Sequence, residues 1–194
     1  MVMDDHQLTG RLATDLDGTF EALVRAHVDR CYAIALRILG DPHDAEEVAQ
    51  DALVRAYRAL ASYEPERIRE LRLRGWLATI VANLARNRLR RHRPPTTSLA
   101  PLVEVGLEPV ADDTTDPETL AGRRVDRDEL AGAILALPER YRLPIVLRHV
   151  DDLSYEDIAT ALDRPVGTVK AQVHRGLAIL RHTLSLHDPQ ELTA

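Results

Sequence analysis

The chain has 194 residues, enough for one domain or two small ones, since compact domains usually have about 100–150 residues. Hydrophobic residues make up 45% of the chain and aromatic residues only 4%, which favours an all-helical fold with a core of Leu, Ala, Val and Ile. The single cysteine, Cys31, excludes an internal disulfide and a cysteine-based zinc site, and the formal net charge of -6 is strongly segregated along the chain.

Residues 1–19 are polar and acidic, and we expect them to form a disordered tail. They lack the basic and then apolar layout of a signal peptide, and the sequence has no apolar run long enough to span a bilayer. The eight histidines are scattered without the spacing of metal ligands. The sequence therefore predicts a cytoplasmic protein without membrane insertion, cofactor or metal.

Two helices are expected next. Apolar residues recur at helical spacing from Phe20 to Leu39 and stop at Gly40, and Cys31 lies within this series as a core residue. Asp41-Pro42 then opens a second helix, whose acidic first turn suits the positive end of the helix dipole. One side of this helix is polar and acidic, with Asp44, Glu46, Glu47, Gln50 and Asp51. Taken alone, such a side is more simply explained as a solvated helix start.

A strongly basic segment follows. From Arg67 to Arg93 there are nine arginines and one acid, Glu70, and an apolar face predicts a helix from Trp76 to Arg91. Cations bind phosphates and amides can hydrogen-bond unstacked bases, so this segment is a candidate single-strand site. Trp76 could stack on a base, although a lone Trp before Leu77 is better explained as core. The candidates are Arg72, Arg74, Trp76, Asn83, Arg86, Asn87 and Arg90.

These helices define an N-terminal domain over residues 20–93. Residues 94–129 contain several prolines and many acids and predict a flexible acidic linker. Helical periodicity returns over residues 130–184, which form a second small domain, and residues 185–194 are expected to be a frayed tail.

The second domain has the layout of a helix-turn-helix. A short apolar helix is followed by a turn and by Ser154, which is placed to cap the next helix, and a tight turn at Asp163-Arg164 then leads to Pro165 at the start of the last helix. Two helices joined by so short a turn must cross steeply.

The last helix separates its residues into two sides. Val169, Val173 and Leu180 lie on the core side, whereas the opposite side carries small residues and cations and the helix contains no acid. Small residues let a backbone approach base edges in the major groove, and cations can reach the flanking phosphates. The candidate duplex contacts are Arg164, Gly167, Thr168, Lys170, Ala171, Gln172, His174 and Arg175.

Two sets of motifs resemble one protein family. The runs Leu137-Pro138-Glu139-Arg140, Leu153 to Ala159 and Pro165 to Lys170 resemble region 4 of the extracytoplasmic-function (ECF) sigma factors of bacterial RNA polymerase. The runs Asp44 to Asp51, Arg55-Ala56-Tyr57, Trp76-Leu77 and Asn83 to Arg91 resemble their region 2. Both sets occur in the family's order and together cover nearly the whole chain between residues 20 and 184.

The resemblance implies a sigma factor that binds core RNA polymerase, at the beta-prime clamp and the beta flap, and directs promoter-specific initiation. Region 4 would bind the minus-thirty-five duplex, and region 2 would open the minus-ten element and capture it as a single strand. The polar side over residues 44–51 would then bind the polymerase, and the acidic linker would occupy its basic RNA-exit path as a nucleic-acid mimic. An anti-sigma factor is a further expected partner.

Two departures concern the bound sequence. The family's recognition helix usually has Lys-Ser-Arg where this chain has Lys170-Ala171-Gln172, and the segment from Glu66 to Leu73 is unusually rich in Arg. Promoter preferences of relatives therefore do not transfer directly to this chain.

Two other classes of protein fit parts of the pattern. A stand-alone helix-turn-helix regulator would need a receiver or ligand domain, and the N-terminal half lacks the alternating strands and helices of a receiver. An enzyme acting on nucleic acid would need clustered acids or metal ligands, which the sequence does not place together.

Overall fold

The computed structural model describes residues 4–92, 127–150 and 152–186, which form two helical units. The first unit contains α1 (Asp5–Leu12), α2 (Leu16–Leu39), α3 (Pro42–Leu60), α4 (Pro65–Arg69) and α5 (Leu73–His92). The second contains α7 (Arg127–Ala136), α8 (Glu139–His149), α9 (Tyr155–Leu162) and α10 (Val166–Leu186). The described residues are helical apart from short turns, as the composition predicts.

Side-chain caps explain where several helices begin. Asp15 accepts from the Gly18 amide at the start of α2, and Asp41 accepts from the Asp44 amide at the start of α3. Ser154 accepts from the Asp157 amide at the start of α9. Each cap satisfies an amide that has no partner inside its own helix, so these short polar residues fix the element boundaries.

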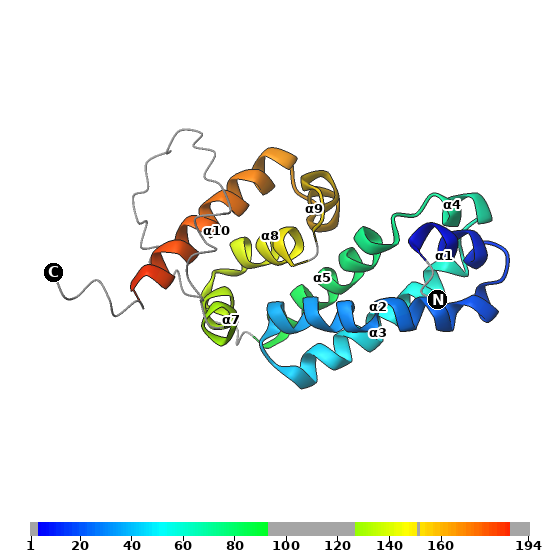
Figure 1. The fold of residues 1–194 in the computed structure, drawn as a ribbon, viewed down its shortest axis with the longest axis horizontal. Helices are drawn as coiled ribbons and strands as arrows, with labels where there is room; N and C mark the ends of the chain where they lie inside the picture. The colour runs from blue at the N-terminus through cyan, green and yellow to red at the C-terminus, as the bar shows by residue number, and fades with distance from the viewer. Residues whose placement is uncertain (1–3, 93–126, 151, 187–194) are drawn as a thin grey trace.

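The first unit is a bundle in which α2, α3 and α5 pack against one another (Figure 1). Its buried residues include several alanines, which let the helices approach closely, and the core contains Leu23, Ile34, Ile38, Ala52, Ala56, Val81 and Ala82. Cys31 is 2% exposed, which confirms its expected place in the core. Gly40 ends α2 at φ 79°, a left-handed conformation that glycine adopts without strain.

The expectation of a disordered tail over residues 1–19 is wrong for the part that the structure describes. Asp4 and Gln7 form a capping box that starts α1, and Leu8 and Leu12 are each 1% exposed. This helix packs against α2, α4 and α5. One pair of leucines four residues apart is too short a pattern to predict a helix, and α2 begins at Leu16 because Asp15 caps it.

The second unit is a helix-turn-helix built on α8, α9 and α10, with α7 packed against α10. Leu143, Val146, Ile158, Val169 and Val173 form its core. Asp163 takes a left-handed conformation, φ 53°, that turns the chain from α9 into α10. The expected linker over 94–129 lies outside the described residues up to 126, and its last three residues begin α7.

The two units are packed together rather than separated. α9 lies beside α5, while α7 and α8 contact α2 (Figure 1), and the buried apolar residues of both units form one continuous cluster. In the described part of the chain, no helix is long and apolar enough to cross a membrane.

Candidate nucleic-acid and protein interfaces

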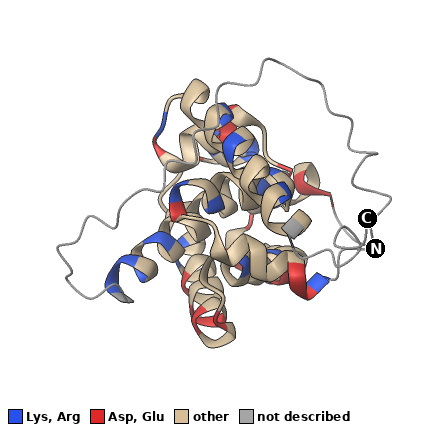
Figure 2. Cartoon of the chain, turned by 90° about the vertical axis from the view of Figure 1, so that its left-hand side faces the viewer, with Lys and Arg blue, Asp and Glu red and all other residues tan. Residues whose placement is uncertain are grey.

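The outer face of α10 is exposed along its first three turns. Six of the eight residues predicted to contact duplex DNA are exposed: Gly167, Thr168, Lys170, Ala171, His174 and Arg175. The opposite side of the helix is buried through Val169, Val173 and Leu180. This helix carries no acid. Figure 2 shows the Lys and Arg of the chain in blue and its Asp and Glu in red. The arrangement leaves a cationic surface with a small-residue centre free to approach a groove.

Arg164 and Gln172 are half-buried and pair with each other. Arg164 Nη1 donates to Gln172 Oε1 at 2.9 Å and to the Arg140 carbonyl at 3.4 Å. Pro144 lies inside α8 and has no N–H to offer to that carbonyl four residues earlier. Arg164 thus partly satisfies a carbonyl that Pro144 leaves free, and it fixes the turn between α9 and α10.

A glycine sets how closely α10 approaches α8. A Cβ on Gly176 would overlap Ile145 Cδ1 and lie 3.2 Å from Tyr141 Cβ, so a larger residue at this crossing would require Ile145 and α8 to shift. Tyr155 on α9 also lies between two cations, with Lys170 Nζ 5.6 Å and the Arg148 guanidinium carbon 5.0 Å from its ring centroid. Arg148 is an additional cation that the sequence pattern did not single out.

The candidates on α5 divide into exposed and partnered groups. Asn87 and Arg90 are exposed, whereas Asn83 is half-buried and accepts from Arg86 Nη2 at 3.1 Å. The Arg86 Nε atom is buried and has no hydrogen-bond partner among the residues that the structure describes. Trp76 is half-buried beside Tyr63, with 6.2 Å between the ring centroids. It is therefore neither a fully buried core residue nor a fully exposed stacking surface.

The arginines around the start of α5 contact other elements. Arg72 Nη1 lies 3.0 Å from Asp157 Oδ1 on α9, and Arg74 Nε lies 3.6 Å from Asp5 Oδ2 on α1. The guanidinium carbon of Arg67 lies 3.8 Å from the ring centroid of Tyr63. These contacts place the basic segment against α1, α9 and an aromatic pair.

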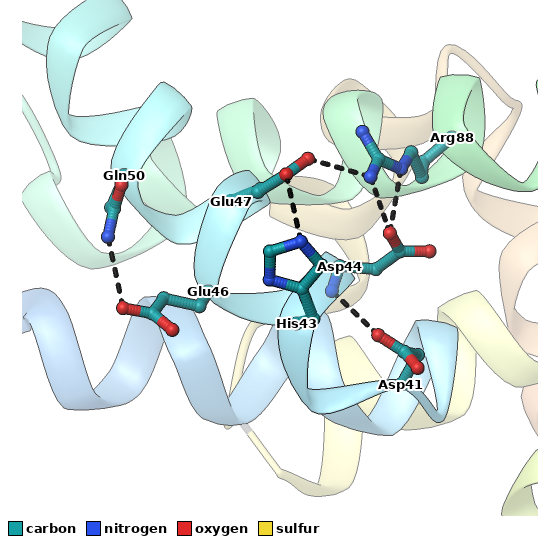
Figure 3. Close-up of polar contacts among 7 residues, drawn as sticks. All are labelled: Asp41, His43, Asp44, Glu46, Glu47, Gln50 and Arg88. Carbon is teal, nitrogen blue, oxygen red and sulfur yellow. Dashed lines mark hydrogen bonds and ion pairs between the residues drawn. The ribbon is translucent and has the colours of Figure 1, made fainter.

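The polar side of α3 has two parts (Figure 3). Arg88 of α5 lies 2.5 Å from Asp44 Oδ1 and 2.7 Å from Glu47 Oε2, so these two acids hold α3 to α5. The hydrogen bond to Asp44 is the main cause that raises the pKa of Arg88 above its ordinary value. Glu46, Gln50 and Asp51 remain exposed, with Gln50 Nε2 donating to Glu46 Oε1 at 3.2 Å.

An apolar patch continues this exposed part of α3. Val54 is 48% exposed and Tyr57 37%, and Val54 follows Glu46 and Gln50 at four-residue spacing. The Tyr57 hydroxyl donates to Asp17 Oδ1 at 2.6 Å, and this bond raises the pKa of Tyr57. In the sequence, Val54 is an apolar residue that lies outside the helical repeat of the α3 core residues. That departure is the signal that could have revealed the apolar patch.

Comparison with protein families gives two matches in this chain. The model described as Sigma-70 region 2 matches residues 23–94, and the model described as Sigma-70, region 4 matches residues 127–180. The two matches correspond to the two helical units.

Curated relatives match across most of the chain. The ECF RNA polymerase sigma factor SigW of Bacillus subtilis is 34% identical over 174 residues, which cover 85% of this chain and 88% of SigW. The ECF RNA polymerase sigma factor SigE of Mycolicibacterium smegmatis is 33% identical over 172 residues, and the match spans 89% of this chain but 64% of SigE. The ECF RNA polymerase sigma-E factor of Escherichia coli K12 is 30% identical over 177 residues, and the match covers 89% of this chain and 90% of that factor.

Two solved structures share the fold. CnrH in complex with the cytosolic domain of CnrY has a TM-score of 0.64 at 24% identity, covering 95% of this chain and 99% of the solved one. The sigma factor RpoE in complex with the anti-sigma factor NepR, from Bartonella quintana, has a TM-score of 0.63 at 21% identity. The match covers 87% of this chain and 98% of the solved one.

Proposed function

Since this chain belongs to the ECF sigma factors of the sigma-70 family and directs transcription initiation, we propose that its two helical units divide the promoter between them. α10 binds the minus-thirty-five element as a duplex, and α5 with the preceding arginines captures the opened minus-ten strand. The observation that carries the proposal is the exposed, acid-free outer face of α10.

Duplex binding by α10 rests on shape and charge. Gly167, Thr168 and Ala171 leave the helix thin where it would enter the major groove, and the groove is wide enough to admit a helix. Lys170, His174 and Arg175 stand around this centre, where cations can contact phosphates. Arg164 and Gln172 act mainly by holding the helix in place, since each already has a partner within the chain.

Strand capture by α5 rests on the exposed end of that helix. Asn87 and Arg90 offer an amide for base edges and a cation for phosphate, and Trp76 and Tyr63 offer aromatic faces near the Arg-rich turn. Single strands are bound by this combination of basic groups and stacking surfaces.

Polymerase binding is assigned to the exposed part of α3. Glu46, Gln50 and Asp51 form an acidic and polar edge that continues into Val54, and such an edge complements a basic surface with an apolar centre. Asp44 and Glu47 contribute indirectly by fixing α3 against α5 through Arg88.

Other parts of the role follow from the family. The chain is a DNA-binding initiation factor and leaves the chemistry to the polymerase, so we assign it no catalysis of its own and place it in the cytoplasm with the chromosome. The solved relatives were determined with CnrY and with the anti-sigma factor NepR, which supports an anti-sigma partner for this chain as well.

The alternative of a stand-alone regulator is not favoured, because a region 2 model matches the first unit.

The test is reconstituted transcription with core RNA polymerase from the source organism. Purified chain and core enzyme together should produce a specific transcript that neither produces alone. Failure with every promoter from a genomic library, by a chain that still binds duplex DNA, would instead favour the stand-alone regulator.

A further inference from the structure

One side chain on the outer face of α10 differs chemically from every other basic residue of the chain. The sequence contains 25 Lys and Arg residues, and Lys170 is the only lysine among them. Because Lys170 is exposed, the only side-chain amine of the sequence lies on the surface assigned to duplex DNA. A guanidinium keeps its charge, whereas a lysine amine can be acylated and then carries none.

The surroundings of Lys170 hold its amine at the surface. The Nζ atom lies 5.6 Å from the ring centroid of Tyr155, within the range of a cation–π contact. Tyr155 is half-buried at the start of α9, so its ring is held by the fold. The amine of Lys170 is thus oriented by an aromatic ring and remains accessible to a reagent from solvent.

The neighbours of this amine are also cationic. The guanidinium carbon of Arg148 lies 5.0 Å from the centroid of the same Tyr155 ring. His174 follows Lys170 by one helical turn, Arg175 is exposed on the same face, and α10 contains no acid. A surface with one sign of charge raises the local concentration of a reactant of the opposite sign. An acyl phosphate, which is an anion, is the class of acyl donor that this surface would concentrate.

We propose that Lys170 is an acylation site, at which an acyl phosphate transfers its acyl group to Nζ and thereby weakens duplex binding by α10. The proposal rests on the proposed function of α10. In the reaction, the neutral amine attacks the carbonyl carbon of the donor, an amide N–C bond forms, and the C–O bond to phosphate breaks. The phosphate leaves with the electron pair of that bond, and the amine gives up a proton to solvent.

The expected effect on DNA binding is electrostatic. Gly167, Thr168 and Ala171 are unchanged, so the helix keeps the shape that fits the groove. The acylated side chain has no charge, and its contact with a phosphate no longer releases a counterion. Affinity varies with about the −0.9 power of the salt concentration for each phosphate contact, so the loss of one contact should lower affinity about eightfold at about 0.1 M salt.

Acetyl phosphate tests the proposal on the full chain. After incubation, peptide mass spectrometry locates the acetyl groups, and ion exchange separates chains acetylated at Lys170 from unmodified chains. The acetylated chains should bind a minus-thirty-five duplex about eightfold more weakly at about 0.1 M salt, with the slope of log affinity against log salt lower by about one unit. Absence of acetylation at Lys170, or acetylated chains with unchanged affinity and slope, would overturn the proposal.

Two variants identify the group that reacts and the property that matters. Lys170→Arg leaves the sequence without lysine, so incubation with acetyl phosphate should leave its affinity at the value measured before incubation. Lys170→Gln removes the charge without any reagent and should reproduce the slope of the acetylated chain. A treated Lys170→Arg chain that loses affinity, or a Lys170→Gln chain with the slope of the unchanged protein, would contradict the proposal.

A further comparison distinguishes this proposal from the proposed function. Arg25→Gln makes the same charge change at an exposed position on α2 and should keep the slope of the unchanged chain. If the untreated chain binds the duplex and initiates transcription, while Lys170→Gln and acetylation have no more effect than Arg25→Gln, the acylation proposal alone fails. If the untreated chain neither binds a minus-thirty-five duplex nor initiates transcription with core polymerase, the proposed function fails as well.

Discussion

At the scale of single residues, the cations on α10 differ in whether the folded chain already uses them. Arg175 is exposed at the outer face, whereas Arg164 donates to Gln172 and to a backbone carbonyl. Replacing Arg175 should therefore affect DNA alone, while replacing Arg164 should also loosen the turn before α10.

Arg175→Ala should weaken binding to the minus-thirty-five duplex and lower the slope of log affinity against log salt by about one unit, because one phosphate contact releases about one counterion. Titrations at several salt concentrations measure the slope. Arg25→Ala, an exposed arginine on α2 that pairs with Glu21, is the matched control and should leave the slope unchanged. An unchanged slope in Arg175→Ala would remove this residue from the phosphate contacts.

His27 makes the fold sensitive to acid. Its side chain is 4% exposed, and burial lowers its pKa below 6.5, assisted by Arg30 and Arg74 and opposed by Asp5. The unfolded chain then binds the proton more tightly than the folded chain, so the free energy of unfolding falls as the pH drops below 6.5. His149, whose pKa is lowered by burial and by Arg148, acts in the same direction.

His27→Gln should reduce this loss of stability between neutral and mildly acidic pH. Urea unfolding at two pH values on either side of 6.5 gives the difference. His43→Gln, at an exposed position on α3, should keep the pH dependence of the unchanged chain. If both variants lose stability equally on acidification, burial of His27 is not the cause.

At the scale of helices, glycine and proline decide how the second unit is assembled. Pro144 interrupts the hydrogen bonds of α8, and Gly176 allows α10 to cross α8 at close range. The orientation of α10 is therefore set by its packing on α8 as well as by the turn between α9 and α10.

Gly176→Ala should lower the free energy of unfolding by up to about 2 kcal/mol, since an overpacking cost of about 1–3 kcal/mol is offset by a gain in helix propensity of about 1 kcal/mol. Gly132→Ala on α7 gains the same propensity with nothing within 4 Å, so it should be neutral or stabilising. Thermal unfolding compares the two. A stabilised Gly176→Ala variant would show that α8 can move away from α10.

The exposed end of α5 should act in opening rather than in duplex binding. Asn87→Ala should slow the appearance of permanganate-reactive thymines near minus ten while leaving affinity for a minus-thirty-five duplex unchanged, because Asn87 lies on the first unit. Equal effects on both measurements would place the defect in folding or in polymerase binding.

Sequence patterns predicted these helices to different extents. Gly40, Asp41 and Ser154 end or begin helices through local chemistry, so those boundaries can be found from sequence. The pairing of Asp44 and Glu47 with Arg88 could not, because it joins residues more than forty positions apart and leaves no periodic trace. Two of the five residues predicted to bind polymerase, Asp44 and Glu47, are thus paired with another helix.

At the scale of the whole molecule, the packing of the two units was the part least accessible to sequence. Arg72 and Asp157 are 85 positions apart, and neither departs from the pattern of an exposed charge. The two domains were expected to be joined only by a linker. Their contact depends on shape at Gly75 and Gly40, where the partner helix approaches the backbone.

Separation of the units should be visible directly. Dyes at Arg37→Cys and Ala136→Cys, in a Cys31→Ala background, lie at exposed positions near the contact between α2 and α7 and should show high energy transfer in the free chain. Adding core polymerase and promoter DNA should lower the transfer, since about 85 Å of DNA then lies between the elements. Constant transfer would mean that the units stay packed during initiation.

The exposed, acid-free outer face of α10 also bears on how the free factor is distributed in a growing cell. A chain that presents this cationic face should retain the weak, sequence-independent duplex affinity needed to sample the chromosome.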